Sequence, residues 1–283
     1  GLALTAAPAT AAADPWRVVE AATGKGLRWR DLTGRLAKCD AVFVGEQHDD
    51  PETHLLEARL VADLHRRVGE RLVLAMEMFE RDQQGALDDY LHGRVDEATL
   101  AKTIALWKNY PTDYRPMVEL AREKKLAVVA SNAPQKHVRQ VGRQGLAALD
   151  ALPAAERAHV AACVHAPAGD TYQKRFYATM EGMSSSHGGG GGDALLRRIY
   201  EAQCVRDDTM AESIERALTP GKVVVHVNGS FHSDAGLGTA ARLRWRRPLG
   251  LSVAVVKAVP VKGDVAAADP APLRGEADYL VFV

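Results

Sequence analysis

The stretch Val42-Phe43-Val44-Gly45-Glu46-Gln47-His48 has a counterpart in Val225-His226-Val227-Asn228-Gly229-Ser230-Phe231-His232 near the other end of the chain. Both contain the pattern G-x-x-H directly after a short apolar run rich in β-branched residues. Such runs are typical of buried strands in a parallel sheet. Open α/β sheets bind ligands just beyond the carboxyl ends of their strands, so the two motifs predict one site at one sheet edge.

Further apolar runs alternate with helical patterns along the chain. We expect strands at 41–45, 72–76, 126–130, 222–228, 251–259 and 279–283, and a small hairpin between Trp16 and Trp29. This alternation predicts an α/β fold with a mostly parallel central sheet flanked by helices.

The region 135–219 contains no clear strand pattern and predicts helices at about 135–149, 153–163, 170–182 and 193–218. We therefore expect an α/β domain built from 14–134 and 220–283, with 135–219 inserted as a helical cap subdomain. Within the cap, 184–192 is a Ser- and Gly-rich loop that carries His187. Five consecutive glycines disfavour a regular helix or strand, because glycine loses more conformational entropy on folding than other residues.

Composition limits the possible partners and the location. The 283 residues include 36 basic and 36 acidic side chains, and this balance argues against nucleic acid as a partner. Residues 1–13 are apolar and uncharged, which predicts the remainder of a signal peptide, with a disordered Ala-rich tail as the alternative. Export is therefore expected. Cys39, Cys163 and Cys204 are too few and too scattered for a disulfide framework or a metal knuckle.

Polar side chains suited to chemistry stand at the ends of several expected strands: Glu46, His48, Glu77, Asn132, Asn228 and His232. Glu46, His48, Glu77 and His232 together suit a divalent metal such as Zn, Mn or Fe, or general acid–base catalysis. In a hydrolase, His48 would activate water while His232 or the metal steadies the oxyanion. His54 is placed to support His48. The alternative is that these groups cap helices or bond to loop backbone.

The doubled motif, with Glu46 ahead of His48 and Glu77 between the copies, resembles the Tiki superfamily. Several stretches resemble its ChaN branch of haem-binding proteins: 42–49, 76–80, 114–122, 131–134, 201–203 and 207–211. The resemblance runs from about Trp29 to Phe282. It implies an exported bacterial haem-uptake protein that binds haem in the cap region and forms a homodimer around it. An outer-membrane haem receptor is the implied partner for haem transfer.

Haem requires an axial ligand, apolar walls and cations for its propionates. Within 170–198 the candidates for these roles are Tyr172, Tyr177, His187, Arg175 and Met180. A tyrosinate suits ferric iron. Tyrosine and methionine at helical spacing are also common in cores, so core packing is the alternative. Residues 1–14 contain no cysteine for lipid attachment, which favours a soluble periplasmic form over a membrane-associated lipoprotein.

Overall fold

The computed structural model describes residues 15–185 and 192–283. The predicted signal-peptide remainder and His187 lie outside these ranges. The strands are β1 (Arg17–Glu20), β2 (Gly26–Leu27), β3 (Ala41–Glu46), β4 (Leu72–Glu80), β5 (Ala127–Asn132), β6 (Val223–Gly229), β7 (Val253–Val259) and β8 (Tyr279–Phe282). The α-helices are α1 (Trp29–Leu36), α2 (Pro51–Val68), α3 (Gln84–Leu91), α4 (Glu97–Thr103), α5 (Arg115–Lys124), α6 (Gln135–Gln144), α7 (Ala154–Arg157), α8 (Thr171–Ser185), α9 (Asp193–Ala217) and α10 (Gly238–Arg246).

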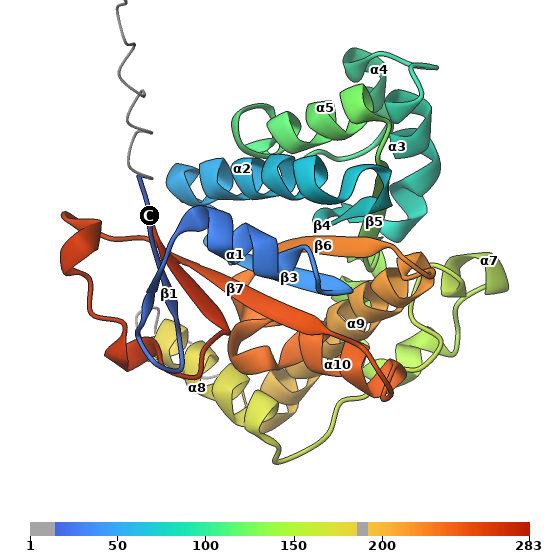
Figure 1. The fold of residues 1–283 in the computed structure, drawn as a ribbon. Coiled ribbons are helices and arrows are strands. Elements are labelled where there is room, and N and C mark those ends of the chain that lie inside the picture. Colours follow the sequence, from blue (N-terminus) through green and yellow to red (C-terminus); the bar gives the residue numbers. More distant parts are fainter. Residues whose placement is uncertain (1–14, 186–191) are drawn as a thin grey trace, which may run out of the picture.

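The described strands form a single sheet in the order β2-β1-β8-β7-β3-β6-β4-β5. The six strands from β8 to β5 run parallel, and β1 pairs antiparallel with both β2 and β8. The expected fold class, with its mostly parallel sheet flanked by helices, is confirmed (Figure 1). β3 and β6, which precede the two motifs, are neighbours in this sheet, with Gly45 opposite Asn228.

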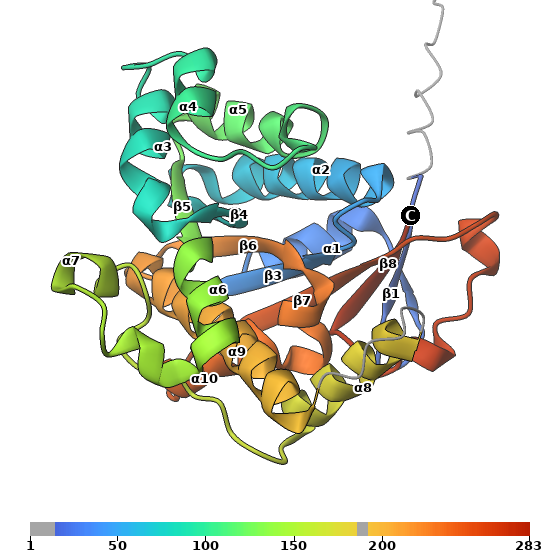
Figure 2. The ribbon, with the colours of Figure 1, turned by 180° about the vertical axis from the view of Figure 1, so that it is seen from behind.

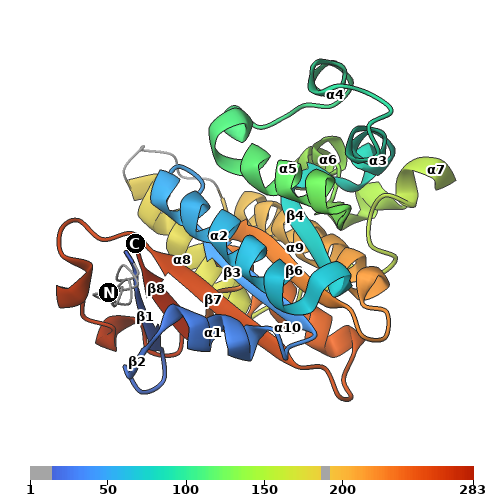
Figure 3. The ribbon, with the colours of Figure 1, turned by 45° about the horizontal axis from the view of Figure 1, so that its top comes forward.

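Helices cover the sheet on both faces, as Figures 2 and 3 show from two further sides. Side chains of α1, α2 and α5 pack on one face in the largest apolar cluster, which includes Leu32, Leu60 and Val118. Residues of α9 and α10, such as Ile214 and Leu243, pack on the other face against β3 and β6. The helix that follows β3 (α2) and the helix that follows β6 (α10) thus cover opposite faces of the sheet. Two neighbouring strands with this arrangement form a switch point, and open sheets bind ligands at such a point.

Two local expectations differ from the structure. The hairpin exists as β1 and β2, but Trp29 begins helix α1 rather than ending a strand. The helix expected at 153–163 is wrong beyond Arg157, because the amides of Ala161 and Ala162 donate to Thr209 and Glu212 of α9 instead of continuing a helix.

The region 135–219 contains helices and no strand in its described part, as its pattern indicates. Its longest helix, α9, reaches the sheet and packs on β4, β5 and β6. Within 15–185 and 192–283, no helix combines the length and apolar character needed to cross a membrane.

Candidate functional site

The first motif places His48 just beyond the end of β3, against Glu46. His48 Nδ1 lies 2.5 Å from Glu46 Oε1, and the hydroxyl of Tyr114 donates to the same oxygen at 2.7 Å. The Glu46 side chain is fully buried, whereas that of His48 is 43% exposed. The carboxylate thus directs the Nδ1 proton and leaves Nε2 as the atom available for chemistry.

Gly229 of the second motif makes room for this histidine. A Cβ atom at position 229 would lie 2.6 Å from His48 Nε2, closer than real atoms approach. The Gly229 amide also donates to Glu77 Oε2 at 2.7 Å. The glycine of one motif therefore positions both the histidine of the other motif and the carboxylate between them.

The second motif places His232 in a different environment, buried between two carboxylates. His232 Nδ1 lies 2.7 Å from Asp207 Oδ1 of α9, and His232 Nε2 lies 3.3 Å from Glu77 Oε1. Asp207 is itself fully buried and accepts hydrogen bonds from Tyr172 at 2.6 Å and Thr239 at 2.8 Å. This histidine is held on both ring nitrogens.

The electrostatics follow from these partners. Burial opposes the charge on Glu46, but hydrogen bonds from His48 and His54 outweigh it and lower the pKa of Glu46 to about 2. Burial likewise opposes protonation of His232, yet Glu77 and Asp207 raise the pKa of His232 to about 10. The pKa of Glu77 is strongly lowered, because the nearby histidines overcome its burial. His232 therefore forms ion pairs with Glu77 and Asp207 at neutral pH.

His54 supports Glu46 more directly than it supports His48. Its Nδ1 lies 3.0 Å from Glu46 Oε2 and 3.3 Å from Glu57 Oε2, and its Nε2 lies 3.3 Å from the His48 carbonyl oxygen. In the described part of the chain, Glu46, His54 and Glu57 are the group whose ligand atoms are close enough to share a metal ion. This group has Glu46 in common with the four metal ligands expected from the sequence.

Both motif histidines border one cavity of about 300 Å³. Its lining consists of Glu46, Gln47, His48, Phe176, Thr179, Gln203, Gly229, Ser230, Phe231 and His232. The structure thus brings Glu46, His48 and His232 to one pocket. Glu77 does not line this pocket but contacts His232. Phe176 and Thr179 of α8, Gln203 of α9 and the Asp207 partner were not among the expected site residues.

The residues expected to bind haem occupy two environments on α8. Tyr172 is buried and its hydroxyl donates to Asp207, so the pKa of Tyr172 lies well above its usual value through burial and this carboxylate. Tyr177 and Met180 are half-buried and pack against the cluster that contains Phe176 and Tyr200. Arg175 forms two hydrogen bonds with Glu276, at 3.0 and 2.6 Å.

Two solved structures are similar to this chain over most of its length. The solved structure of ChaN of Campylobacter jejuni, described with cofacial haem binding, superimposes with a TM-score of 0.71 over 94% of this chain and 96% of that one, at 17% identity. A protein of Bacillus cereus follows the same fold with a TM-score of 0.52 over 89% of this chain and 90% of its own, at 12% identity.

Among curated sequences, RETICULATA-RELATED 5 of Arabidopsis thaliana, a chloroplastic protein, is 25% identical over 235 residues. The match covers 76% of this chain but 30% of that protein, so this chain spans less than a third of the relative. A family model described as haem-binding uptake, Tiki superfamily, ChaN matches residues 32–243. That match covers most of the chain, which therefore belongs to the ChaN haem-binding family of the Tiki superfamily.

Proposed function

We propose that this protein binds haem beside α8, with Tyr177 as the axial ligand of the iron. Membership of the ChaN family supports haem as the ligand. The proposed location of the haem rests on the position of Tyr177, a half-buried phenol at the border of an aromatic cluster on α8 and α9.

The residues of this cluster suit a flat apolar ring system. Tyr177 lies 6.4 Å from Phe176 and 6.1 Å from Tyr200 between ring centroids, and Phe176 lies 5.9 Å from Phe231. Tyr200 is fully buried within this cluster.

Tyr177 suits the axial position better than Tyr172. The Tyr177 hydroxyl accepts one bond, from Gln173 at 3.2 Å, whereas Asp207 holds the Tyr172 proton in place. Bound haem would supply a ferric iron that stabilises a phenolate oxygen. Met180 would contribute apolar wall, and Arg175 would meet a propionate at the cost of its pairing with Glu276.

The wider role we propose is haem uptake by an exported, periplasmic protein that pairs as a homodimer around haem and exchanges it with an outer-membrane receptor. His187, a candidate haem residue from the sequence, lies outside the described residues. The family description of haem-binding uptake supports this role.

The test is a titration of the purified protein with hemin, followed in the Soret region and by resonance Raman spectroscopy of the ferric complex. We expect saturable binding with the vibrations of an iron–phenolate bond, which disappear in Tyr177→Phe and persist in Tyr172→Phe. Tyr172→Phe is the matched control because it removes one hydroxyl from the same helix. Saturable binding that keeps the phenolate signature in Tyr177→Phe would refute the ligand assignment, and no saturable binding would refute the function.

One observation favours a second candidate, an acid–base hydrolase of amides or esters. Glu46 holds Nδ1 of His48, and this pairing raises the pKa of His48 against its partial burial. Such an imidazole can accept a proton from water at Nε2 while Glu46 stabilises the imidazolium. Hydrolysis of model esters or peptides that is lost in His48→Ala and retained in Tyr177→Phe would support this candidate.

A further inference from the structure

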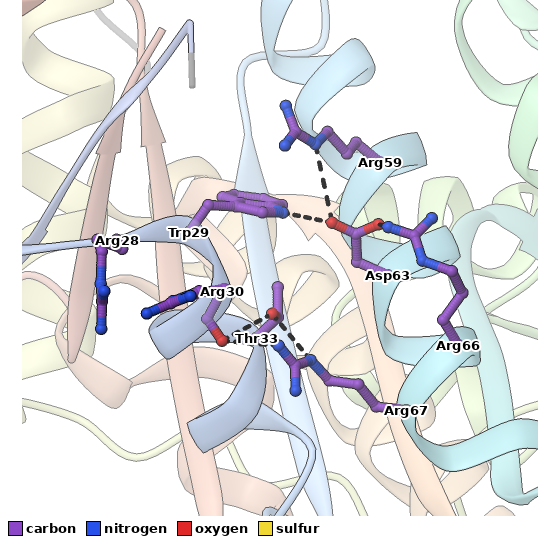
Figure 4. Close-up of a pocket in the computed structure, with 8 residues that line it drawn as sticks. All are labelled: Arg28, Trp29, Arg30, Thr33, Arg59, Asp63, Arg66 and Arg67. Carbon is purple, nitrogen blue, oxygen red and sulfur yellow. Dashed lines mark hydrogen bonds and ion pairs between the residues drawn. The ribbon is translucent and has the colours of Figure 1, made fainter. Parts of the chain in front are cut away.

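A hollow of about 620 Å³ lies on the outer side of α1 and α2. Figure 4 shows its lining: Arg28, Trp29, Arg30, Thr33, Arg59, Asp63, Arg66 and Arg67. It shares no residue with the cavity that contains the motif histidines. Five of its eight lining residues are arginines, in a chain whose formal net charge is zero.

A single buried carboxylate organises the α2 side of this hollow. The Trp29 indole donates to Asp63 Oδ2 at 2.5 Å, Arg66 pairs with Asp63 Oδ1, and Arg59 Nε lies 3.7 Å from Oδ2 (Figure 4). The Arg59 guanidinium also lies 5.3 Å from the rings of Trp16 and Trp29. These contacts hold arginine and aromatic groups in fixed positions around the opening.

The α1 side is held in a similar way. Arg67 donates from Nε to Thr33 Oγ1 at 3.0 Å and from Nη2 to the Arg30 carbonyl oxygen at 2.7 Å. The side chains of Arg30 and Arg66 remain 69% and 71% exposed, so their guanidinium groups stand at the mouth of the hollow. The arginines thus approach one space from two helices.

Arginines outnumber the acidic side chains around this space in the described part of the chain. Within the described residues, Asp63 is the one acidic side chain in the lining, and Asp31 at its edge pairs with Arg28 at 2.7 Å and lies 3.8 Å from Arg30. Among the described residues, five arginines therefore meet two carboxylates around this space. A compact group with several negative charges can contact several of these guanidinium groups at once, whereas one carboxylate cannot.

We propose that this hollow binds a small molecule carrying two or more phosphate groups. The planar fork of arginine matches phosphate oxygens in a bidentate way, and several forks around one space select for phosphate over isolated carboxylates. The volume lies within the usual range of small-molecule pockets. A concave site on a chain of balanced charge favours a soluble phosphate compound over an extended anionic surface.

The experiment uses the full chain and inorganic pyrophosphate as the probe, with isothermal calorimetry and tryptophan fluorescence as readouts. The test variant is Arg30→Ala/Arg66→Ala, which removes two exposed side chains at the mouth. The control is Arg94→Ala/Arg143→Ala, which removes two exposed arginines from other surfaces. We expect saturable binding that weakens with added salt, is on the order of tenfold weaker in the test variant, and is unchanged in the control.

Two further arms separate this proposal from its alternatives. Vesicles of phosphatidylglycerol and phosphatidylcholine test a lipid source of phosphate, and binding to vesicles without affinity for pyrophosphate would overturn the proposal. Equal loss of pyrophosphate affinity in both double variants, or no affinity in the unmodified protein, would overturn it as well. Hemin binding by Arg30→Ala/Arg66→Ala should remain unchanged, so the outcome is independent of the haem site.

Discussion

The sheet edge and the aromatic cluster of α8 and α9 border the same cavity, but the edge presents carboxylates and histidines and the cluster presents aromatic side chains. The edge consists of carboxylates paired with histidines, such as Glu46 with His48 and Asp207 with His232, whereas the cluster consists of aromatic rings with Tyr177 at its border. Buried ion pairs suit proton transfer and hold geometry, but aromatic walls suit a large apolar ligand. The proposed haem site thus lies on the helices, whereas both motif histidines follow strands.

The largest effect should follow from breaking the buried charge network of the edge. Asp207→Ala removes the acceptor of Tyr172 and Thr239 and one partner of His232. We expect the free energy of unfolding to fall by about 3–5 kcal/mol, because a buried histidine charge loses half of its compensation. Urea denaturation measures this loss.

Asp89→Ala provides the control for this substitution. Asp89 forms an exposed pair with Arg94, so its removal should change the free energy of unfolding by about 0.5 kcal/mol or less. Similar losses for Asp207→Ala and Asp89→Ala would mean that the network at the edge does not stabilise the fold.

The same network predicts how stability depends on alkaline pH. The pKa of His232 is about 10 in the folded protein, and an unfolded histidine titrates near 6.5. The folded state therefore holds a proton that the unfolded state releases, so its stabilisation is complete below pH ~6.5 and is lost as pH rises through ~10. Urea denaturation between pH ~7 and ~9.5 should show a falling free energy of unfolding, with a smaller slope in His232→Gln. Identical slopes would contradict the buried charge.

A smaller effect should follow from crowding the contact between the two motifs. Gly229→Ala places a methyl group where His48 Nε2 now lies, so the imidazole must move. We expect a loss of about 1–3 kcal/mol in the free energy of unfolding. Gly26→Ala is the control, because its new methyl group meets no atom within 4 Å. A loss no greater than that of Gly26→Ala would show that the close approach is not required.

The smallest effect on stability is expected for His48→Ala. His48 is partly exposed, and Glu46 keeps its hydrogen bond from Tyr114 and its contact with His54 after the imidazole is gone. The free energy of unfolding should fall by about 1 kcal/mol or less. A loss as large as that of Asp207→Ala would remove the difference between the two motif histidines.

The sequence was enough to place the site at the sheet edge, but not to identify the buried partner of His232. Apolar runs ending in Gly45 and Gly229 were enough to predict that the two motifs lie at one edge of one sheet, because parallel strands have their carboxyl ends on the same side. Asp207 was missed, since a carboxylate within a long helix pattern carries no sign of burial. Only the packing of α9 on the sheet makes it a partner of His232.

The helices were harder to predict than the strands. Trp29, Leu32, Thr33 and Leu36 have the spacing of a buried helix face, which could have revealed α1. Tyr172 and Tyr177 could not be distinguished by spacing, because their difference lies in Asp207, a residue 35 positions from Tyr172. The arginine hollow joins Arg28 and Arg30 to the far end of α2, and such a pairing of helices requires the tertiary structure.

The most direct test of the comparison is the hemin affinity of Tyr177→Phe beside that of His48→Ala, each measured against the unmodified protein by Soret titration. We predict that Tyr177→Phe weakens hemin binding on the order of tenfold or more, while His48→Ala changes it by about threefold or less. Hemin affinity that is lost in His48→Ala and kept in Tyr177→Phe would contradict the assignment of haem to α8 and transfer it to the sheet edge.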